Sequence, residues 1–285
     1  MKKVFVVALI LLLGEILLSA SYAGTMTIEK KQYHLFNPAP KTLMREMSTD
    51  RPDKTESPYT VDAGHYQIEA NVFDYAYDHD NPENQRVDTF TFAAMNIKAG
   101  LFNNTDIQFV INPYIEEHTK GNGQTEHKSG FGDIQTRLKL NLWGNDNGPT
   151  ALAVMPFVKF PTNTGDLGNT AVEGGVIFPL AISLPAEWKM GIMTEFDFKR
   201  NLKKDYYTDF INSITFGHSI VGDLSGYVEF FSSFNNEEGS AWIGTVDVGL
   251  TYAVSEDIQL DSGVNIGVTQ SADDFAPFLG CSLRY

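Results

Sequence analysis

One extended stretch with two unlike faces constrains this chain more than any other feature. Residues 132–144 read GDIQTRLKLNLWG. Apolar and polar residues alternate along this stretch: Ile134, Thr136, Leu138, Leu140 and Leu142 against Gln135, Arg137, Lys139 and Asn141. Strands of soluble proteins usually run about five or six residues, whereas a tilted strand needs about nine to eleven to cross a bilayer. This alternation has the longer span, and Trp143 ends it where an interfacial aromatic belongs. The pattern predicts a membrane-spanning strand.

The same design recurs along the chain from Gly64 onward. We expect twelve strands, at about residues 66–75, 90–99, 106–115, 132–144, 151–160, 173–184, 189–199, 208–218, 224–234, 242–252, 258–268 and 275–285. The links that follow odd strands are the longer ones, such as 116–130, and those that follow even strands are short, such as 185–187. This sorting on an even strand count is typical of outer-membrane barrels. We therefore predict an all-β fold, a transmembrane antiparallel β-barrel of about 12 strands over residues 64–285.

Aromatic residues support this prediction because they gather at both ends of the strands. One set falls at the short-link end and the other at the long-link end: Tyr66, Trp143, Trp188, Tyr252 and Tyr285 against Phe160, Tyr206, Phe234, Trp242 and Phe275. Two such girdles are expected of a barrel that faces lipid. The alternative is an aromatic core in a soluble β protein.

The two ends of the chain indicate its destination. Residues 1–23 have a basic start, an apolar core and a small-residue cleavage site, which predicts a secretory signal peptide. At the other end, Gly280, Leu283 and Tyr285 resemble the C-terminal insertion signal read by the barrel-assembly machinery, although Phe278 departs from that pattern. We expect export to the outer membrane of a Gram-negative bacterium, with outer-membrane lipid and lipopolysaccharide as partners. A net charge of −15 argues against nucleic acid.

Residues 24–63 lack strand alternation and are rich in proline, so we expect an irregular periplasmic arm or plug. The segment TDRPDKTESPYTV at 49–61, followed by GHYQIE at 64–69, resembles the N-terminal signature of the outer-membrane transporters grouped as "MetA-pathway of phenol degradation". The GFGD motif at 130–133 is similar to another feature of that group. The resemblance implies a channel for passive uptake of small molecules, with aromatic compounds among the candidates.

Charges on the inward faces suggest how such a channel works. One wall is cationic and the other anionic, giving a lumen path of Lys98, Arg137, Lys139, Lys159, Glu195, Asp197, Asp209, Glu229, Asp247 and Asp261. Unpaired charges in a dry interior would be prohibitive, so the lumen is either watered or filled with paired side chains. We favour a watered, charged, narrow pore. The arm would enter it through Thr49, Asp50, Arg51, Pro52, Asp53 and Glu56.

Other function classes receive less support from the residues. A phospholipase-like enzyme needs a His/Ser pair, and the adjacent pair His218-Ser219 sits at the periplasmic end with no nucleophile motif around it. A structural or adhesive barrel is a further alternative. Loop residues His79, His118 and His127 are interpreted as solvated, with weak metal binding as the alternative. We assign no catalytic residue, cofactor or metal site, and the single cysteine, Cys281, excludes a disulfide framework within the chain.

Overall fold

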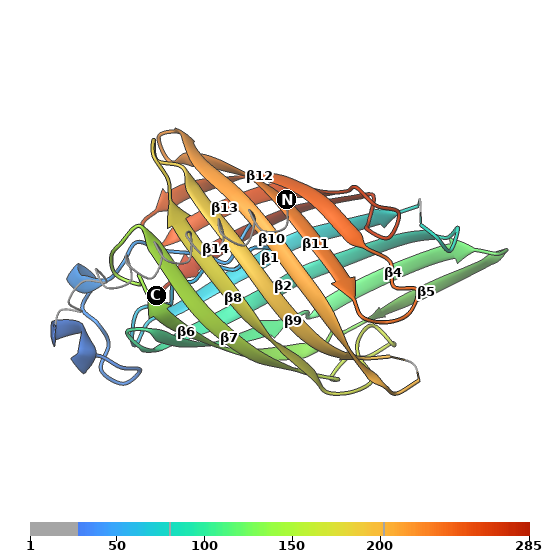
Figure 1. The fold of residues 1–285 in the computed structure, drawn as a ribbon, viewed down its shortest axis with the longest axis horizontal. Coiled ribbons are helices and arrows are strands. Elements are labelled where there is room, and N and C mark those ends of the chain that lie inside the picture. Colours follow the sequence, from blue (N-terminus) through green and yellow to red (C-terminus); the bar gives the residue numbers. More distant parts are fainter. Residues whose placement is uncertain (1–27, 80, 202) are drawn as a thin grey trace, which may run out of the picture.

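The computed structural model describes residues 28–79, 81–201 and 203–285; the predicted signal peptide, residues 1–23, lies outside these ranges. Antiparallel strands form a closed barrel, in agreement with the sequence prediction (Figure 1). The strands are β1 (Tyr66–Asp78), β2 (Arg86–Phe102), β3 (Thr105–Ile111), β4 (Tyr114–Gly121), β5 (Gln124–Gly130), β6 (Ile134–Trp143), β7 (Thr150–Phe160), β8 (Glu173–Ser183), β9 (Lys189–Arg200), β10 (Tyr206–Val221), β11 (Leu224–Asn235), β12 (Ile243–Ser255), β13 (Ile258–Gly267) and β14 (Phe275–Arg284).

Consecutive strands pair except for β3 with β4 and β5 with β6; β2 pairs with both β3 and β4, and β3 pairs with β6. β1 closes the barrel by pairing with both β14 and β2. The fourteen labelled strands occupy twelve strand positions around the barrel wall, and each such position is called a stave below. β3 and β4 share one stave, interrupted at Asn112-Pro113, where proline has no N–H for the ladder. β5 and β6 share the next stave, interrupted at residues 131–133.

The link at residues 116–130 differs from its prediction as a loop. It forms most of a β-hairpin, β4–β5, and β2 continues far enough to pair with β4 from Arg86 to Phe92. A long β2 needs a hydrogen-bonding neighbour over its whole length, and β4 supplies it. The pattern was not visible in the sequence because the hairpin lies beyond the membrane, where both of its faces can be polar.

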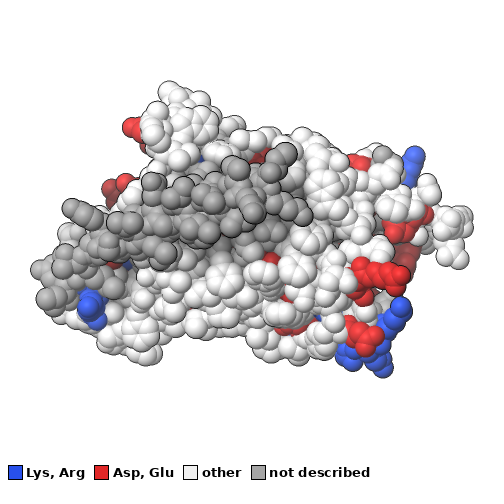
Figure 2. Space-filling model, viewed as in Figure 1, with Lys and Arg blue, Asp and Glu red and all other residues white. Residues whose placement is uncertain are grey.

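The facing of the wall follows the predicted alternation. Leu138 is 42% exposed on the outer face of β6, whereas its neighbour Lys139 is 1% exposed on the inner face. Aromatic residues of both predicted girdles are exposed on the outside, such as Trp188 at the short-turn end and Trp242 at the other. In Figure 2 the visible flank is mostly uncharged, and charged residues gather at the end where the long links lie. This is the surface expected of a barrel embedded in lipid.

The arm precedes β1, and its described part, residues 28–63, is irregular apart from two 3-10 turns, η1 (Ile28–Gln32) and η2 (Lys41–Leu43). It lies at the short-turn end of the barrel, beside the C-terminus, before its later part enters the interior (Figure 1). Within the described ranges, no helical segment has the length and hydropathy of a membrane-spanning helix.

Candidate functional site: the arm inside the barrel

The arm is anchored first at the short-turn mouth. The Arg45 guanidinium forms ion pairs with Asp62 at 3.2 Å and with Asp146 at 3.1 Å. Lys30 contacts the same Asp146 carboxylate, and Arg284 of the last strand donates a hydrogen bond to the Arg45 carbonyl oxygen at 2.7 Å. Burial would raise the pKa of Asp146, but hydrogen bonds from Lys30 and Asn103 and the charge of Arg45 outweigh it and lower the pKa. The mouth therefore holds the arm by charge pairs close to solvent.

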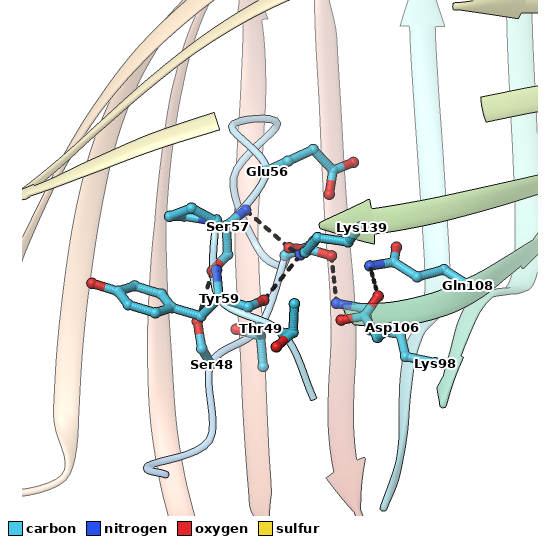
Figure 3. A network of polar contacts seen from close by, with 12 residues as sticks. Ser48, Thr49, Glu56, Ser57, Tyr59, Lys98, Asp106, Gln108 and Lys139 are labelled. Atoms are coloured by element: carbon cyan, nitrogen blue, oxygen red, sulfur yellow. Dashed lines mark hydrogen bonds and ion pairs between the residues drawn. The ribbon is translucent and has the colours of Figure 1, made fainter. Parts of the chain in front are cut away.

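Inside the barrel, Asp50 is the centre of a buried network. Figure 3 shows its partners Ser57, Lys98 and Lys139. Its carboxylate forms ion pairs with Lys98 and, at 2.7 Å, with Lys139, and it accepts a hydrogen bond from the Ser57 N–H at 2.9 Å. The Asp50 N–H donates to Glu69 of β1, which also pairs with Lys98. One arm carboxylate thus pairs with two lysines of the predicted cationic wall, Glu69 supplies the second negative charge, and the bond to Ser57 closes the arm into a loop.

The opposite face of the arm meets the anionic wall. Arg51 pairs with Asp261 at 2.6 Å, and Lys54 lies 3.3 Å from Asp247. Glu229 accepts hydrogen bonds from the backbone N–H groups of Lys54 and Thr55, both at 2.8 Å. Arm cations and backbone donors therefore bond to three buried acidic residues of this wall, Asp261, Asp247 and Glu229.

The remaining predicted lumen residues divide into two groups. Arg137 contacts the arm directly through an ion pair with Glu56, and Glu195 lies beside Arg137 and Asp197. The rest pair within the wall and not with the arm: Asp197 and Asp209 with Lys199, and Lys159 with Asp133 at 3.8 Å. At the level of the arm, most of the predicted lumen charges are therefore paired with side chains of opposite charge.

Glycines on the inner wall make room for the arm. A Cβ at Gly280 would lie 2.1 Å from the Arg51 guanidinium, and one at Gly191 would lie 3.0 Å from the Thr55 methyl group. Gly280 was predicted only as part of the insertion signal. The Phe278 departure from that signal has a related explanation, because its ring faces inward and lies under the Arg51 guanidinium, 5.6 Å from the ring centroid.

Two sets of inward residues escaped the sequence prediction. Glu69 and Asp106 stand within the wall that we had described as cationic, although both have the inward parity that identified Lys98. An apolar cluster also occupies the interior where β7 to β11 adjoin: Met155, Phe157, Ile177, Met193 and Ile211, with Phe231 packed against it. These residues carry no charge that would mark them as inward-facing, so the sequence did not predict the cluster. The Glu56 N–H points at the Met193 sulfur, so the arm reaches the cluster.

Space remains between the arm and one side of the wall. A cavity of about 840 Å³ opens at the short-turn mouth, bordered by Pro52, Asp53 and Gln259. A smaller cavity of about 190 Å³ continues beside residues 55–59 as far as Gly191 and Thr215. Both are lined by Thr49, Asp53, Lys189, Gly217 and Tyr227, so they adjoin. The cavities run along β9 to β11 toward the apolar cluster.

Sequence comparison places the chain in a family. Residues 49–285 match the family described as "Putative MetA-pathway of phenol degradation". The chain belongs to this family. The match begins at Thr49, which also starts the arm segment inside the barrel, and the resemblance seen in the sequence is confirmed. The comparison with curated proteins gives no significant match.

Solved structures resemble this MetA-pathway family member in fold. The COG4313 outer membrane channel from Pseudomonas putida F1 has a TM-score of 0.63 at 10% identity, covering 84% of this chain and 100% of that one. The translocator domain of autotransporter NalP from Neisseria meningitidis has a TM-score of 0.45 at 8% identity, covering 77% and 88%. The anion-selective porin from Comamonas acidovorans has a TM-score of 0.38 at 6% identity, covering 77% and 98%.

His218, the histidine considered for catalysis, contacts backbone oxygens in this family member. The two ring nitrogens of His218 face the backbone oxygens of Ser219 and Ala186. Neither nitrogen is therefore directed at the Ser219 hydroxyl, as a general base would be. His65 likewise contacts the backbone oxygens of Tyr285 and Ala39 at the mouth. Both histidines therefore link backbone segments at the short-turn end, and neither is directed at a serine hydroxyl.

Proposed function

We propose that this protein is an outer-membrane channel for small molecules, restricted from the periplasmic side by its own N-terminal arm. One observation carries the proposal: residues 50–56 of the arm lie within the barrel and bond to both walls, through Lys98 and Lys139 on one side and Glu229 on the other. A tether lying outside the barrel would make none of these bonds. The membership in the family and the fold shared with an outer membrane channel support a transport role.

The solute path we propose follows the cavities beside the arm. It begins in the wide cavity at the mouth, narrows beside Thr55 and meets the apolar cluster around Met193 and Phe231. Polar and charged groups line both cavities, whereas the apolar cluster beyond them consists of side chains without charge. A polar passage followed by an apolar region suits a small solute with one polar group and an apolar or aromatic body.

The size of the barrel agrees with this restriction. Barrels of about eight strands are filled by their own side chains, whereas those of sixteen to eighteen leave an aqueous channel. Twelve staves leave room for one additional chain segment, and the arm occupies it. We propose that conduction requires the arm to shift away from the wall, because the apolar cluster is buried while the arm is docked.

A reversible crosslink tests the proposal. The hydroxyl oxygens of Thr55 and Ser213 are 2.6 Å apart, so cysteines at these positions are close enough to form a disulfide. The variant T55C/S213C, with Cys281→Ser to remove the native thiol, is inserted in planar bilayers. We expect low conductance when oxidised and recovery on addition of dithiothreitol. The matched control, T55C with Cys281→Ser, should not respond. Equal conductance in both redox states would refute arm-dependent conduction.

A deletion and a solute comparison complete the test. Removal of residues 24–58 should raise single-channel conductance. Unchanged conductance would contradict the proposal that the arm restricts the channel. With benzoate replacing gluconate as the test anion, reversal potentials should show higher permeability for the aromatic ion. Replacing Met193 and Phe231 by serine should reduce that preference. Equal permeability of the two anions would leave a channel but contradict the aromatic part of the proposal.

A further inference from the structure

The β4–β5 hairpin brings three metal-binding side chains together outside the lumen. It projects past the neighbouring strands at the end opposite the arm (Figure 1). Its turn residues Asn122 and Gly123 both have positive φ, which is the geometry of a two-residue type I′ turn. This turn sets the register that places His118 directly opposite His127. Glu116 lies two residues before His118, so its side chain is on the same face of the hairpin.

The donor atoms of these three residues converge. Glu116 Oε1 lies 2.7 Å from His118 Nε2 and 3.0 Å from His127 Nε2, and one ligand atom from each residue lies within 4.8 Å of the others. The two imidazole rings meet edge to face with their centroids 4.5 Å apart. The three donor atoms are therefore close enough for one cation placed between them to contact all three.

We propose that Glu116, His118 and His127 form a binding site for a divalent transition metal at the outer end of the barrel. Two imidazole nitrogens and one carboxylate oxygen are the donor set that Zn²⁺ and Cu²⁺ accept, whereas Ca²⁺ and Mg²⁺ prefer oxygen ligands. Ligand atoms around a tetrahedral Zn²⁺ are about 3.3 Å apart, given metal–ligand distances of about 2.0–2.2 Å. The two glutamate–histidine separations, 2.7 and 3.0 Å, would need to open by about 0.6 and 0.3 Å to reach this value.

The surroundings of the three residues allow the histidine rings to move and a metal ion to reach them from solvent. The side chains of His118 and His127 are 41% and 53% exposed, so an ion reaches them from solvent and the rings can turn. Asp88 on β2 lies directly across from His118 and accepts a hydrogen bond from the Tyr75 hydroxyl at 2.6 Å. A carboxylate beside a metal-binding imidazole raises local negative charge and is a common outer-shell partner. With three protein ligands, at least one coordination position remains for water or an external anion.

Metal titration of the full-length protein in detergent tests the site. Isothermal titration with ZnCl₂ should show one ion bound per chain. The variant H118A/H127A should bind more than about 100-fold more weakly, since even outer-shell changes cost about 10- to 100-fold in metal affinity. Glu116→Gln should also weaken binding. The matched control is His218→Ala, because His218 lies at the opposite end of the barrel and contacts backbone oxygens.

A spectroscopic measurement identifies the ligands directly. With one equivalent of Cu²⁺, electron paramagnetic resonance of the wild-type protein should show nitrogen coupling from two imidazoles, and H118A/H127A should lose it. Absence of Zn²⁺ and Cu²⁺ binding in the wild type would overturn the proposal. Equal affinity in H118A/H127A, or a copper spectrum without nitrogen coupling, would overturn it as well. The barrel of each variant is verified by its heat-dependent shift in electrophoretic mobility.

Discussion

Replacing Asp50 by alanine should release the arm from the barrel. Lys98 would retain Glu69 as an ion-pair partner, but Lys139 would lose its ion pair and keep a hydrogen bond to the Tyr59 backbone oxygen at 3.3 Å and the more distant charge of Asp106 on β3. Breaking a buried ion pair by removing one partner costs about 3–5 kcal/mol because an uncompensated charge stays behind. At about 1.4 kcal/mol per factor of ten, the undocked population should rise by roughly two to three and a half orders of magnitude.

Limited proteolysis measures this population. Lys54 is bonded inside the barrel, so trypsin reaches the bond after Lys54 only when the arm is undocked. When reclosure is fast relative to cleavage, the cleavage rate follows the equilibrium population of the open form. Asp50→Ala should therefore be cleaved much faster than wild type while the barrel stays intact, and its conductance in planar bilayers should rise.

The control for this experiment is Glu46→Gln. Glu46 is an arm carboxylate near the mouth, but it is exposed and forms no ion pair among the described residues. Its loss changes the arm charge by the same amount without leaving a buried lysine unpaired. If Asp50→Ala is cleaved no faster than Glu46→Gln, the buried network does not hold the arm and the reasoning fails.

Three further predictions concern the wall, the glycine contact and the mouth. Leu140→Lys should destabilise the refolded barrel by about 2–4 kcal/mol when measured by denaturant unfolding in lipid, whereas Gln135→Lys should cost far less. Gly280→Ala should accelerate tryptic release of the arm, since the added Cβ occupies the place of the Arg51 guanidinium. The lowered pKa of Asp146 stabilises the docked arm above the ordinary aspartate pKa. That contribution should be lost as pH falls through the lowered value, with release measured by fluorescence of a labelled arm, and Asp146→Asn should remove this dependence.

Each of these predictions has an outcome that contradicts it. Equal destabilisation by lysine at Leu140 and at Gln135 would contradict the assignment of Leu140 to the lipid-facing side of β6 and of Gln135 to the lumen side. Unchanged proteolysis of Gly280→Ala would show that Arg51 can move away without loosening the arm. An identical pH profile in wild type and Asp146→Asn would assign any acid release to other carboxylates.

The sequence by itself determined the barrel, its strand facing and its two aromatic girdles. These properties are local, because alternation with period two assigns each side chain to a face once lipid lies on one side. Leu138 and Lys139 illustrate this: their order in the chain alone predicted which is exposed and which is buried. The family signature at residues 49–61 was also readable without a structure and was later matched.

Tertiary structure alone decided which charges meet. The contacts of Asp50 with Lys98 and Lys139 join residues 48 and 89 positions apart, and no local pattern specifies such pairs. The same holds for the apolar cluster, whose members come from four different strands. Closure of the barrel brings opposite walls within reach of one arm, and the cost of burying unpaired charge then selects the register in which each finds a partner.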